Sequence, residues 1–126
     1  MLRAVIVDGN TVSRGLLNTV LTEGGYEVVG NTNACRVGYT LVQKHQPHFV
    51  CIARDQMEDG EQLVEQILAV LPKTIIFMVS GAIDAAILQA AMARGVQGFI
   101  VRPFKADAVL KTIRSTVLAM IKKQQG

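Results

Sequence analysis

"FVCIARDQMEDG", residues 49–60, changes from a continuous apolar run to a charged segment within a few positions. Residues 49–53 are all apolar, which is typical of a strand buried on both faces of a parallel sheet. Residues 54–60 are expected to form the loop after it. In α/β proteins ligands sit beyond the carboxyl ends of such strands. Here the strand ends at Ala53, and the nearest acid, Asp55, comes two residues later.

Strand-like and helix-like segments alternate five times along the chain. Apolar runs predict strands at 4–8, 26–29, 49–53, 74–80 and 97–101, and helical spacing predicts helices at 11–23, 33–45, 60–71, 83–93 and from 105 onward. The second strand is the more polar one, which favours an edge position. Strands alternating with helices of this length predict an α/β fold, with a doubly wound five-stranded parallel sheet flanked by five helices. We expect one domain over residues 1–126.

Each predicted helix carries one apolar face, which should pack against the sheet. The residues predicted on these faces are Val12, Leu16, Val20 and Leu21 in the first helix, Val37, Leu41 and Val42 in the second, Leu63, Val64, Ile67 and Leu71 in the third, and Val109, Leu110, Ile113, Val117 and Ile121 in the last.

The composition is that of an ordinary globular domain. Hydrophobic residues make up 50% of the 126 positions and charged residues 18%. A net charge of +3 is too small and too scattered to indicate nucleic-acid binding. No part of the sequence resembles a signal peptide, and no apolar run approaches the length of roughly 20 residues needed to span a bilayer. We therefore expect a cytoplasmic protein that binds neither nucleic acid nor membrane.

The cysteines and histidines predict no metal or redox site. Cys51 falls inside the buried strand, where a free thiol acts as a small apolar group, and Cys35 is expected on a helix, half exposed. His45 and His48 flank Pro47 at a spacing that suits no metal motif, so we expect both on the surface of a connection.

Polar side chains follow four of the predicted strands at their carboxyl ends. They are Asp8 after the first strand, Asp55 shortly after the third, Ser80 after the fourth and Arg102 after the fifth. The carboxyl ends of parallel strands meet at one edge of a sheet, so these groups should converge there. A hydroxyl, a guanidinium and one or two acids at one edge form a candidate binding site.

This arrangement resembles the receiver domain of bacterial two-component response regulators, of the chemotaxis type. The matching stretches run the length of the chain: "VIVDGN" (5–10), "HQPHFVCIA" (45–53), "MEDGEQLV" (57–64), "IIFMVSGA" (75–82) and "GVQGFIVRPF" (95–104). The resemblance implies a flavodoxin-like sheet in the order 2-1-3-4-5, a cis bond between Arg102 and Pro103, and a role in phosphorelay signalling. It also implies that Ser80 and Phe99 are the switch residues.

The candidate site departs from the family pattern at three positions. The family has two adjacent acids after strand one, whereas this chain has Asp8 and then Gly9. The family's phosphoaccepting aspartate corresponds to Ala53 when counted from Pro47, or to Ile52 when counted back from Asp59-Gly60. The family's lysine before Pro103 is Arg102 here.

These departures change the charge of the pocket together. The family's three acids and one lysine attract Mg²⁺, which needs several hard oxygen ligands. Here the charges of Asp8 and Arg102 sum to zero, and including Asp55 gives a net charge of only −1. Arg102 is therefore expected to pair with Asp8 or Asp55 and to occupy the place of the metal. Any Mg²⁺ binding, through Asp8 and Asp55, should be weak.

The leading hypothesis is a degenerate receiver that signals by protein contact without aspartyl phosphate, is not an enzyme and has no cofactor. The alternative is a working phosphoacceptor that uses Asp55 with Mg²⁺. A flavodoxin-like cofactor binder is the third interpretation, but the chain has neither a GxGxxG nor a GxxxxGK[ST] motif.

The resemblance also implies an output surface made by the 83–93 helix, the 97–101 strand and the last helix. Its partners would be a histidine kinase, an output protein or a second receiver, including a homodimer. Leu118 and Met120 lie partly off the core stripe of the last helix, where they either widen the core face or contact a partner. Lys105, Lys111 and Arg114 would give this surface a basic rim that favours an acidic partner.

Overall fold

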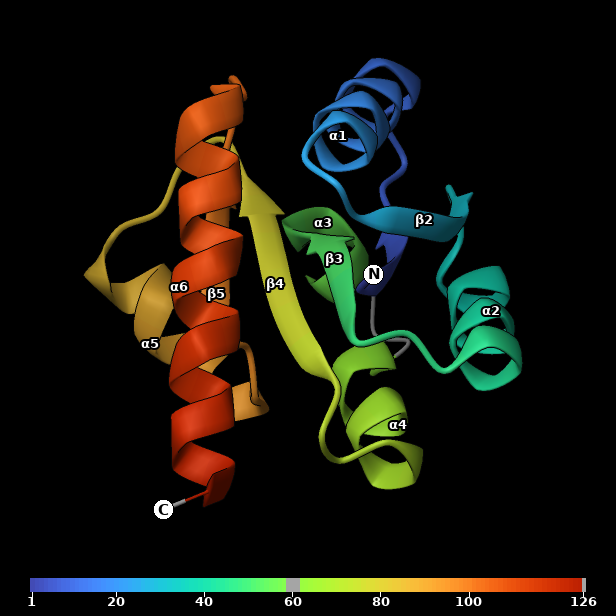
Figure 1. Cartoon of the computed structure of the whole chain (residues 1–126), viewed down its shortest axis with the longest axis vertical. Helices are drawn as coiled ribbons and strands as arrows, with labels where there is room; N and C mark the ends of the chain where they lie inside the picture. The colour runs from blue at the N-terminus through green and yellow to red at the C-terminus, as the bar shows by residue number, and fades with distance from the viewer. Residues whose placement is uncertain (59–61, 126) are drawn as a thin grey trace.

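The computed structural model describes residues 1–58 and 62–125 as one parallel sheet with helices on both faces (Figure 1). The strands are β1 (Arg3–Val7), β2 (Glu27–Thr32), β3 (Phe49–Ala53), β4 (Ile75–Ser80) and β5 (Gly98–Val101). Their order is β2-β1-β3-β4-β5, and every neighbouring pair is parallel. The predicted fold and strand order are confirmed, with β2 at an edge. Asp59, in the predicted loop, and Gly60 and Glu61, at the predicted start of the third helix, lie outside the described residues.

The described residues form six helices, one more than predicted. They are α1 (Thr11–Glu23), α2 (Cys35–His45), α3 (Arg54–Glu58), α4 (Leu63–Val70), α5 (Ala85–Arg94) and α6 (Ala106–Gln125). Of these described helices, none is long and apolar enough to cross a membrane. Side chains of α1 and α6 pack on one face of the sheet, and side chains of α2, α4 and α5 pack on the other.

The additional helix α3 occupies a segment predicted as loop. It begins directly after β3 and makes little more than one turn. Met57 on this turn is only 4% exposed and belongs to the core on the α2–α4–α5 face. Arg54 Nε lies 2.6 Å from Glu58 Oε1 at the i, i+4 spacing of neighbours on a helix surface. The burial of Met57 and the ion pair between Arg54 and Glu58 thus favour a helical turn in this segment.

The buried face of α1 differs from the predicted one. Val12 and Leu16 are 70% and 54% exposed, whereas Ser13, Leu17 and Leu21 are buried. The buried residues follow an i, i+4, i+8 spacing, so α1 does have a single core face. The prediction was wrong for Val12 and Leu16 because a buried serine opens that face, and apolar periodicity does not reveal a buried hydroxyl.

Three further predictions of exposure need correction. Val37 on α2 and Ile121 on α6 were expected in the core but are 48% and 44% exposed. Cys35 was expected to be half exposed but is buried, with its thiol 3.0 Å from Gln56 Oε1. Leu118 does not widen the core face of α6, being 52% exposed, whereas the partly buried Met120 packs against the core.

Candidate functional site

The sheet register shows which residue of β3 stands beside Asp8. Val7 at the end of β1 pairs with Ile52. Asp8 follows Val7, so the residue of β3 level with Asp8 is Ala53, which is fully buried. Ile52 points into the core on the α2–α4–α5 face. Of the two counts from the sequence, the one made from Pro47 therefore gives the corresponding position, and no carboxylate stands there.

Asp8 is nearly inaccessible and fully engaged. The residue is 1% exposed. Its Oδ1 accepts a hydrogen bond from the Asn10 backbone N–H at 2.9 Å. Its Oδ2 accepts from Ser13 Oγ at 2.7 Å and from Arg102 Nη2 at 3.1 Å. A carboxylate offers about four acceptor positions, so the three bonds leave little capacity for a further ligand.

Arg102 closes this arrangement into a ring of hydrogen bonds. Its Nη2 donates to Asp8, and its Nε donates to Ser13 Oγ at 2.9 Å, while Ser13 donates in turn to Asp8. The ring joins β1, α1 and the segment after β5. Of the two acids considered from the sequence, Arg102 pairs with Asp8. We call these three side chains the Asp8–Ser13–Arg102 cluster.

The sequence did not point to two residues that form hydrogen bonds with Asp8. Ser13 is the central hydroxyl of the cluster, and Arg14 Nη1 donates to the Asp8 backbone carbonyl at 2.8 Å. Ser13 shares the i, i+4, i+8 spacing of the buried Leu17 and Leu21, but a hydroxyl adds nothing to an apolar pattern, so the sequence carried no signal for it. Asn10 caps α1 by accepting from the Ser13 N–H at 2.9 Å, and this cap fixes where the helix begins.

Ser80, at the end of β4, is buried and bonds within its own turn. Its hydroxyl donates to the Ala82 carbonyl at 2.7 Å and accepts from the Ala82 N–H at 3.2 Å. Phe99 is partly buried and packs against the core on the α2–α4–α5 face. The bond between Arg102 and Pro103 is cis, as predicted. The strand ends therefore bring Asp8 and Arg102 into contact, while Ser80 satisfies its hydrogen bonds locally.

The family model described as "Response regulator receiver domain" matches residues 4–114 of the chain. The chain belongs to this family. It is therefore a receiver domain of two-component signalling, as the motifs predicted.

Individual relatives agree with this assignment. The chemotaxis protein CheY of Bacillus subtilis (strain 168) is 28% identical over 116 residues, which cover 91% of this chain and 97% of that protein. Among solved structures, the Vibrio cholerae chemotaxis protein CheY4 aligns with a TM-score of 0.81 at 21% identity, over 92% of this receiver and 98% of that chain. NtrX from Brucella abortus aligns with a TM-score of 0.88 at 22% identity, over 98% of this receiver but 29% of that chain.

Asp55, the remaining acid considered for this receiver's chemistry, lies away from the cluster on the first turn of α3. It is exposed, and its Oδ1 accepts from the backbone N–H of the next residue, Gln56, at 3.1 Å. The helical turn that begins at Arg54 carries Asp55 out of line with β3. Asp55 therefore does not occupy the position level with Asp8, which is Ala53.

The donor set at this edge does not fit the Mg²⁺ ion implied by the family. Mg²⁺ needs near-octahedral oxygen ligands and is usually held by one or more accessible carboxylates. Here Asp8 is already bonded to Asn10, Ser13 and Arg102, and Gly9 and Ala53 supply no oxygen from a side chain. Across residues 1–58 and 62–125, no group of three or more His, Cys, Asp and Glu side chains is placed to hold a metal ion.

Proposed function

We propose that this receiver domain transmits signals by protein–protein contact and that its state is not set by aspartyl phosphate. The observation that carries the proposal is the position level with Asp8 at the end of β3, which is occupied by the buried methyl group of Ala53. An aspartyl phosphate forms on a carboxylate, so the chemistry has no acceptor at this place. Arg102 further supports the proposal because its guanidinium neutralises Asp8 directly.

The same arrangement supports the interpretation of the chain as a binding module rather than an enzyme, and as one without a cofactor. Self-phosphorylation would need a metal ion to balance the charge of the incoming phosphoryl group. The only acid within the cluster already pairs with a guanidinium that is permanently charged. No residue of the cluster is thus available as a nucleophile or as a metal ligand.

We assign the partner contact to the surface formed by α5, β5 and α6. Met92 on α5 and Val101 on β5 are 55% and 52% exposed, so two large apolar side chains of this surface face solvent. A groove of about 420 Å³ between β5 and α6 is lined in part by Val101 and Lys105. Lys111 and Arg114 are exposed but do not line it. The partner would be a histidine kinase, an output protein or a second receiver.

Mass spectrometry of the intact protein tests the central claim. After incubation with acetyl phosphate and Mg²⁺, the wild-type chain should show no mass increase of one phosphoryl group. A Mg²⁺-dependent increase that Asp55→Asn abolishes would contradict the proposal and establish the alternative, a phosphoacceptor that uses Asp55. An increase that survives Asp55→Asn would place the acceptor elsewhere and contradict both.

The surface assignment has its own test. Val101→Glu should weaken both self-association, measured by sedimentation velocity, and binding to a histidine kinase. Val12→Glu is the control, because Val12 is also an exposed valine but lies on α1, outside this surface. Equal binding by both variants would show that the α5–β5–α6 surface is not the contact.

A further inference from the structure

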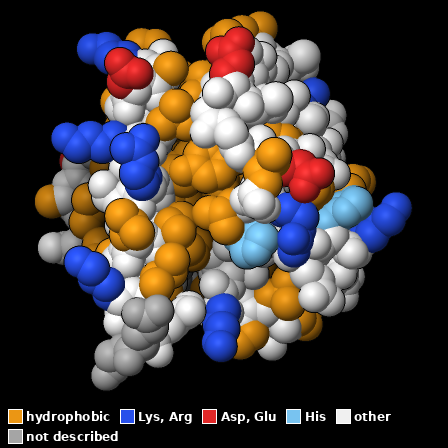
Figure 2. Space-filling model, in the orientation of Figure 1, with side chains coloured by type: hydrophobic (Ala, Val, Ile, Leu, Met, Phe, Trp, Pro, Cys, Tyr) orange, Lys and Arg blue, Asp and Glu red, His pale blue; other side chains and the backbone are white. Residues whose placement is uncertain are grey.

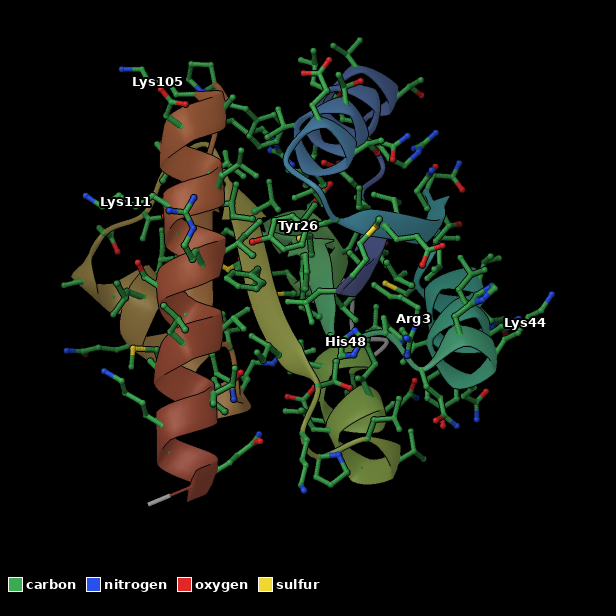
Figure 3. All side chains as sticks on the ribbon, viewed as in Figure 1. Arg3, Tyr26, Lys44, His48, Lys105 and Lys111 are labelled. Atoms are coloured by element: carbon green, nitrogen blue, oxygen red, sulfur yellow. The ribbon has the colours of Figure 1, made fainter. Side chains whose placement is uncertain are left out.

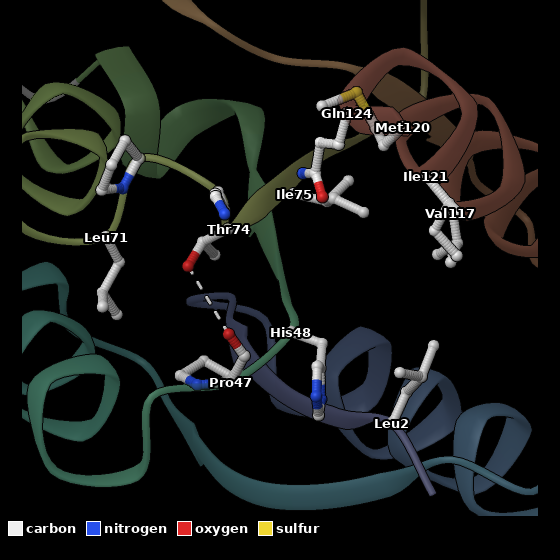
Figure 4. Close-up of a pocket in the computed structure, with 12 residues that line it drawn as sticks. Leu2, Pro47, His48, Leu71, Thr74, Ile75, Val117, Met120, Ile121 and Gln124 are labelled. Atoms are coloured by element: carbon white, nitrogen blue, oxygen red, sulfur yellow. Dashed lines mark hydrogen bonds between the residues drawn. The ribbon is translucent and has the colours of Figure 1, made fainter. Parts of the chain in front are cut away.

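An apolar groove lies at the end of the sheet opposite to Asp8 (Figure 4). Its volume is about 480 Å³, and it separates the C-terminal half of α6 from the amino ends of β1 and β4. Its apolar walls include Leu2, Leu71, Ile75, Val117, Met120 and Ile121. The groove is open to solvent along its length, and the Asp8–Ser13–Arg102 cluster contributes nothing to it. Ligand binding in the groove therefore does not depend on whether the domain accepts a phosphoryl group.

The groove exists because α6 is longer than the helix beside it. α6 has 20 residues and α1 has 13. α1 ends at its C-cap Gly24, where Leu110 of α6 packs so closely that a side chain at Gly24 would overlap it. Val117 and Ile121 continue the Leu110 stripe at helical spacing. Figure 1 shows α6 continuing past α1 toward its C-terminal end, and Ile121 is 44% exposed.

The surroundings of the groove are basic. Lys73 lines it, and Lys122 and Lys123 follow Ile121 in the last turn of α6. The lining residues, all within the described part of the chain, include no aspartate or glutamate. Figure 2 shows the apolar side chains gathered at the centre of this face, with cationic side chains and some acidic ones around them. An acidic ligand would therefore meet complementary charge at the rim.

His48 adds one hydrogen-bond donor to the wall. Its Nδ1 accepts the backbone N–H of Arg3 at 2.9 Å, and the two residues lie together in Figure 3. The pKa of His48 is lowered from its ordinary value of 6.5 by partial burial, then by the charges of Arg3 and the N-terminal amine, so the ring is neutral at pH 7. With Nδ1 accepting, Nε2 carries the ring proton and can donate to a carboxylate or a carbonyl. Glu27 of β2 pairs with Arg3 of β1 and is therefore an acid at this same end of the sheet.

We propose that this groove binds an acidic amphipathic helix of a partner protein. The apolar face of that helix lies against Ile75, Val117 and Ile121, and its carboxylates face Lys73. A helix laid in an apolar groove is a recurrent mode of peptide recognition. A second copy of this chain fits worse, because a two-fold contact would set each basic rim against itself.

The test uses a fluorescently labelled peptide of about 14 residues, long enough for four helical turns. Leucines at i, i+3 and i+4 spacing form its apolar face, and glutamates fill the other positions. A control peptide carries lysines in place of the glutamates. Fluorescence anisotropy should show saturable binding of the acidic peptide, at least about tenfold tighter than that of the basic one, and weakened by salt over about 50–300 mM.

Two variants locate the binding, and each has a matched control. Ile121→Ser removes part of the apolar wall and Lys73→Glu reverses the rim charge, so each should weaken binding by about fivefold or more. Val37→Ser and Lys44→Glu make the same changes at exposed positions of α2 outside the groove and should leave the affinity within about twofold. Circular dichroism should show all four variants folded, since none alters a buried side chain.

Three outcomes would overturn the proposal. The first is no binding of the acidic peptide at concentrations up to about 1 mM. The second is binding that Ile121→Ser and Lys73→Glu leave unchanged. The third is a dimer, seen by sedimentation velocity, that Ile121→Ser dissociates, which would assign the groove to a second copy of the chain.

Discussion

Arg102 holds Asp8 and Ser13 together because a guanidinium carries donors at several positions of a rigid fork. Nη2 reaches the carboxylate while Nε reaches the hydroxyl, so one side chain satisfies two buried groups. A lysine ammonium is a single point charge at the end of a flexible chain and does not provide this geometry. An arginine at this position therefore fits the closed hydrogen-bonded ring better than the family's lysine would.

Removing the guanidinium should destabilise the fold measurably. Arg102→Gln removes a charge-assisted hydrogen bond from the buried Asp8 carboxylate. We expect the free energy of unfolding to fall by about 1–3 kcal/mol. Urea denaturation measures it. Arg54→Gln is the control, because that arginine pairs with Glu58 at the surface, where such a pair contributes below about 1 kcal/mol. Equal effects of the two changes would mean that the cluster adds no stability.

Restoring the missing acids should restore metal affinity. In the Gly9→Asp, Ala53→Asp double variant, two carboxylates join Asp8 at the edge of the sheet and offset the charge of Arg102. A side chain at Gly9 would come 3.1 Å from the flexible end of Gln56, which can move aside. Isothermal titration calorimetry should show tighter Mg²⁺ binding by the variant than by the wild-type chain. Receiver-like affinity in the wild type would instead show that Asp8 and Asp55 suffice.

At the scale of elements, apolar periodicity predicted the existence of helices better than their orientation. Leu63, Val64 and Ile67 of α4 are buried as predicted, because the whole face of that helix is apolar. The face of α1 was misplaced because its first buried residue is Ser13, whose burial depends on Asp8 at the end of another element. Contacts between distant residues decide such positions, and a local pattern does not contain them.

An ion pair between Arg94 and Glu65 joins α4 to α5 and makes stability depend on pH. Arg94 of α5 holds Glu65 of α4 with two bonds, Nε to Oε2 at 2.8 Å and Nη2 to Oε1 at 2.9 Å. The hydrogen bond from Arg94 lowers the pKa of Glu65 below its ordinary value of 4.5, against a smaller opposing effect of burial. A carboxyl with a depressed pKa in the folded state stabilises the fold above its unfolded pKa, and this is lost as the pH falls through the folded pKa.

Glu65→Gln should therefore cost about 0.5–1 kcal/mol near pH 7, an amount suited to a half-exposed bidentate pair. The difference from the wild type should shrink as the pH falls from about 4.5 through the lowered pKa of Glu65, where the wild-type carboxyl also becomes protonated. Urea unfolding at several pH values measures both. Glu23→Gln, at the exposed end of α1, is the control. A cost for Glu65→Gln that stays constant down to about pH 2 would rule out the ion pair as its source.

At the scale of the whole molecule, topology made much of the site predictable. Parallel strands in the order β2-β1-β3-β4-β5 bring all carboxyl ends to one edge, so Asp8 and Arg102 could be placed together although 94 positions separate them. The choice of Asp8 over Asp55 as the partner of Arg102 could not be made, because it depends on the turn of α3. The groove beside α6 was also not foreseen, since it results from the unequal lengths of two helices.

The cluster ties β1, α1 and the segment after β5 into one unit, so its loss should be felt in several elements at once. Amide hydrogen exchange reports local opening across all elements. Acetyl phosphate with Mg²⁺ should leave the exchange of β4, α5 and β5 in the wild-type chain unchanged, because no acceptor couples the reagent to the fold. Arg102→Gln should speed exchange around residues 8–14 and 101–104, since it releases β5 from α1, whereas Arg54→Gln should affect only α3. Slower exchange in α5 and β5 on adding the phosphodonor would show that the domain still responds to phosphorylation.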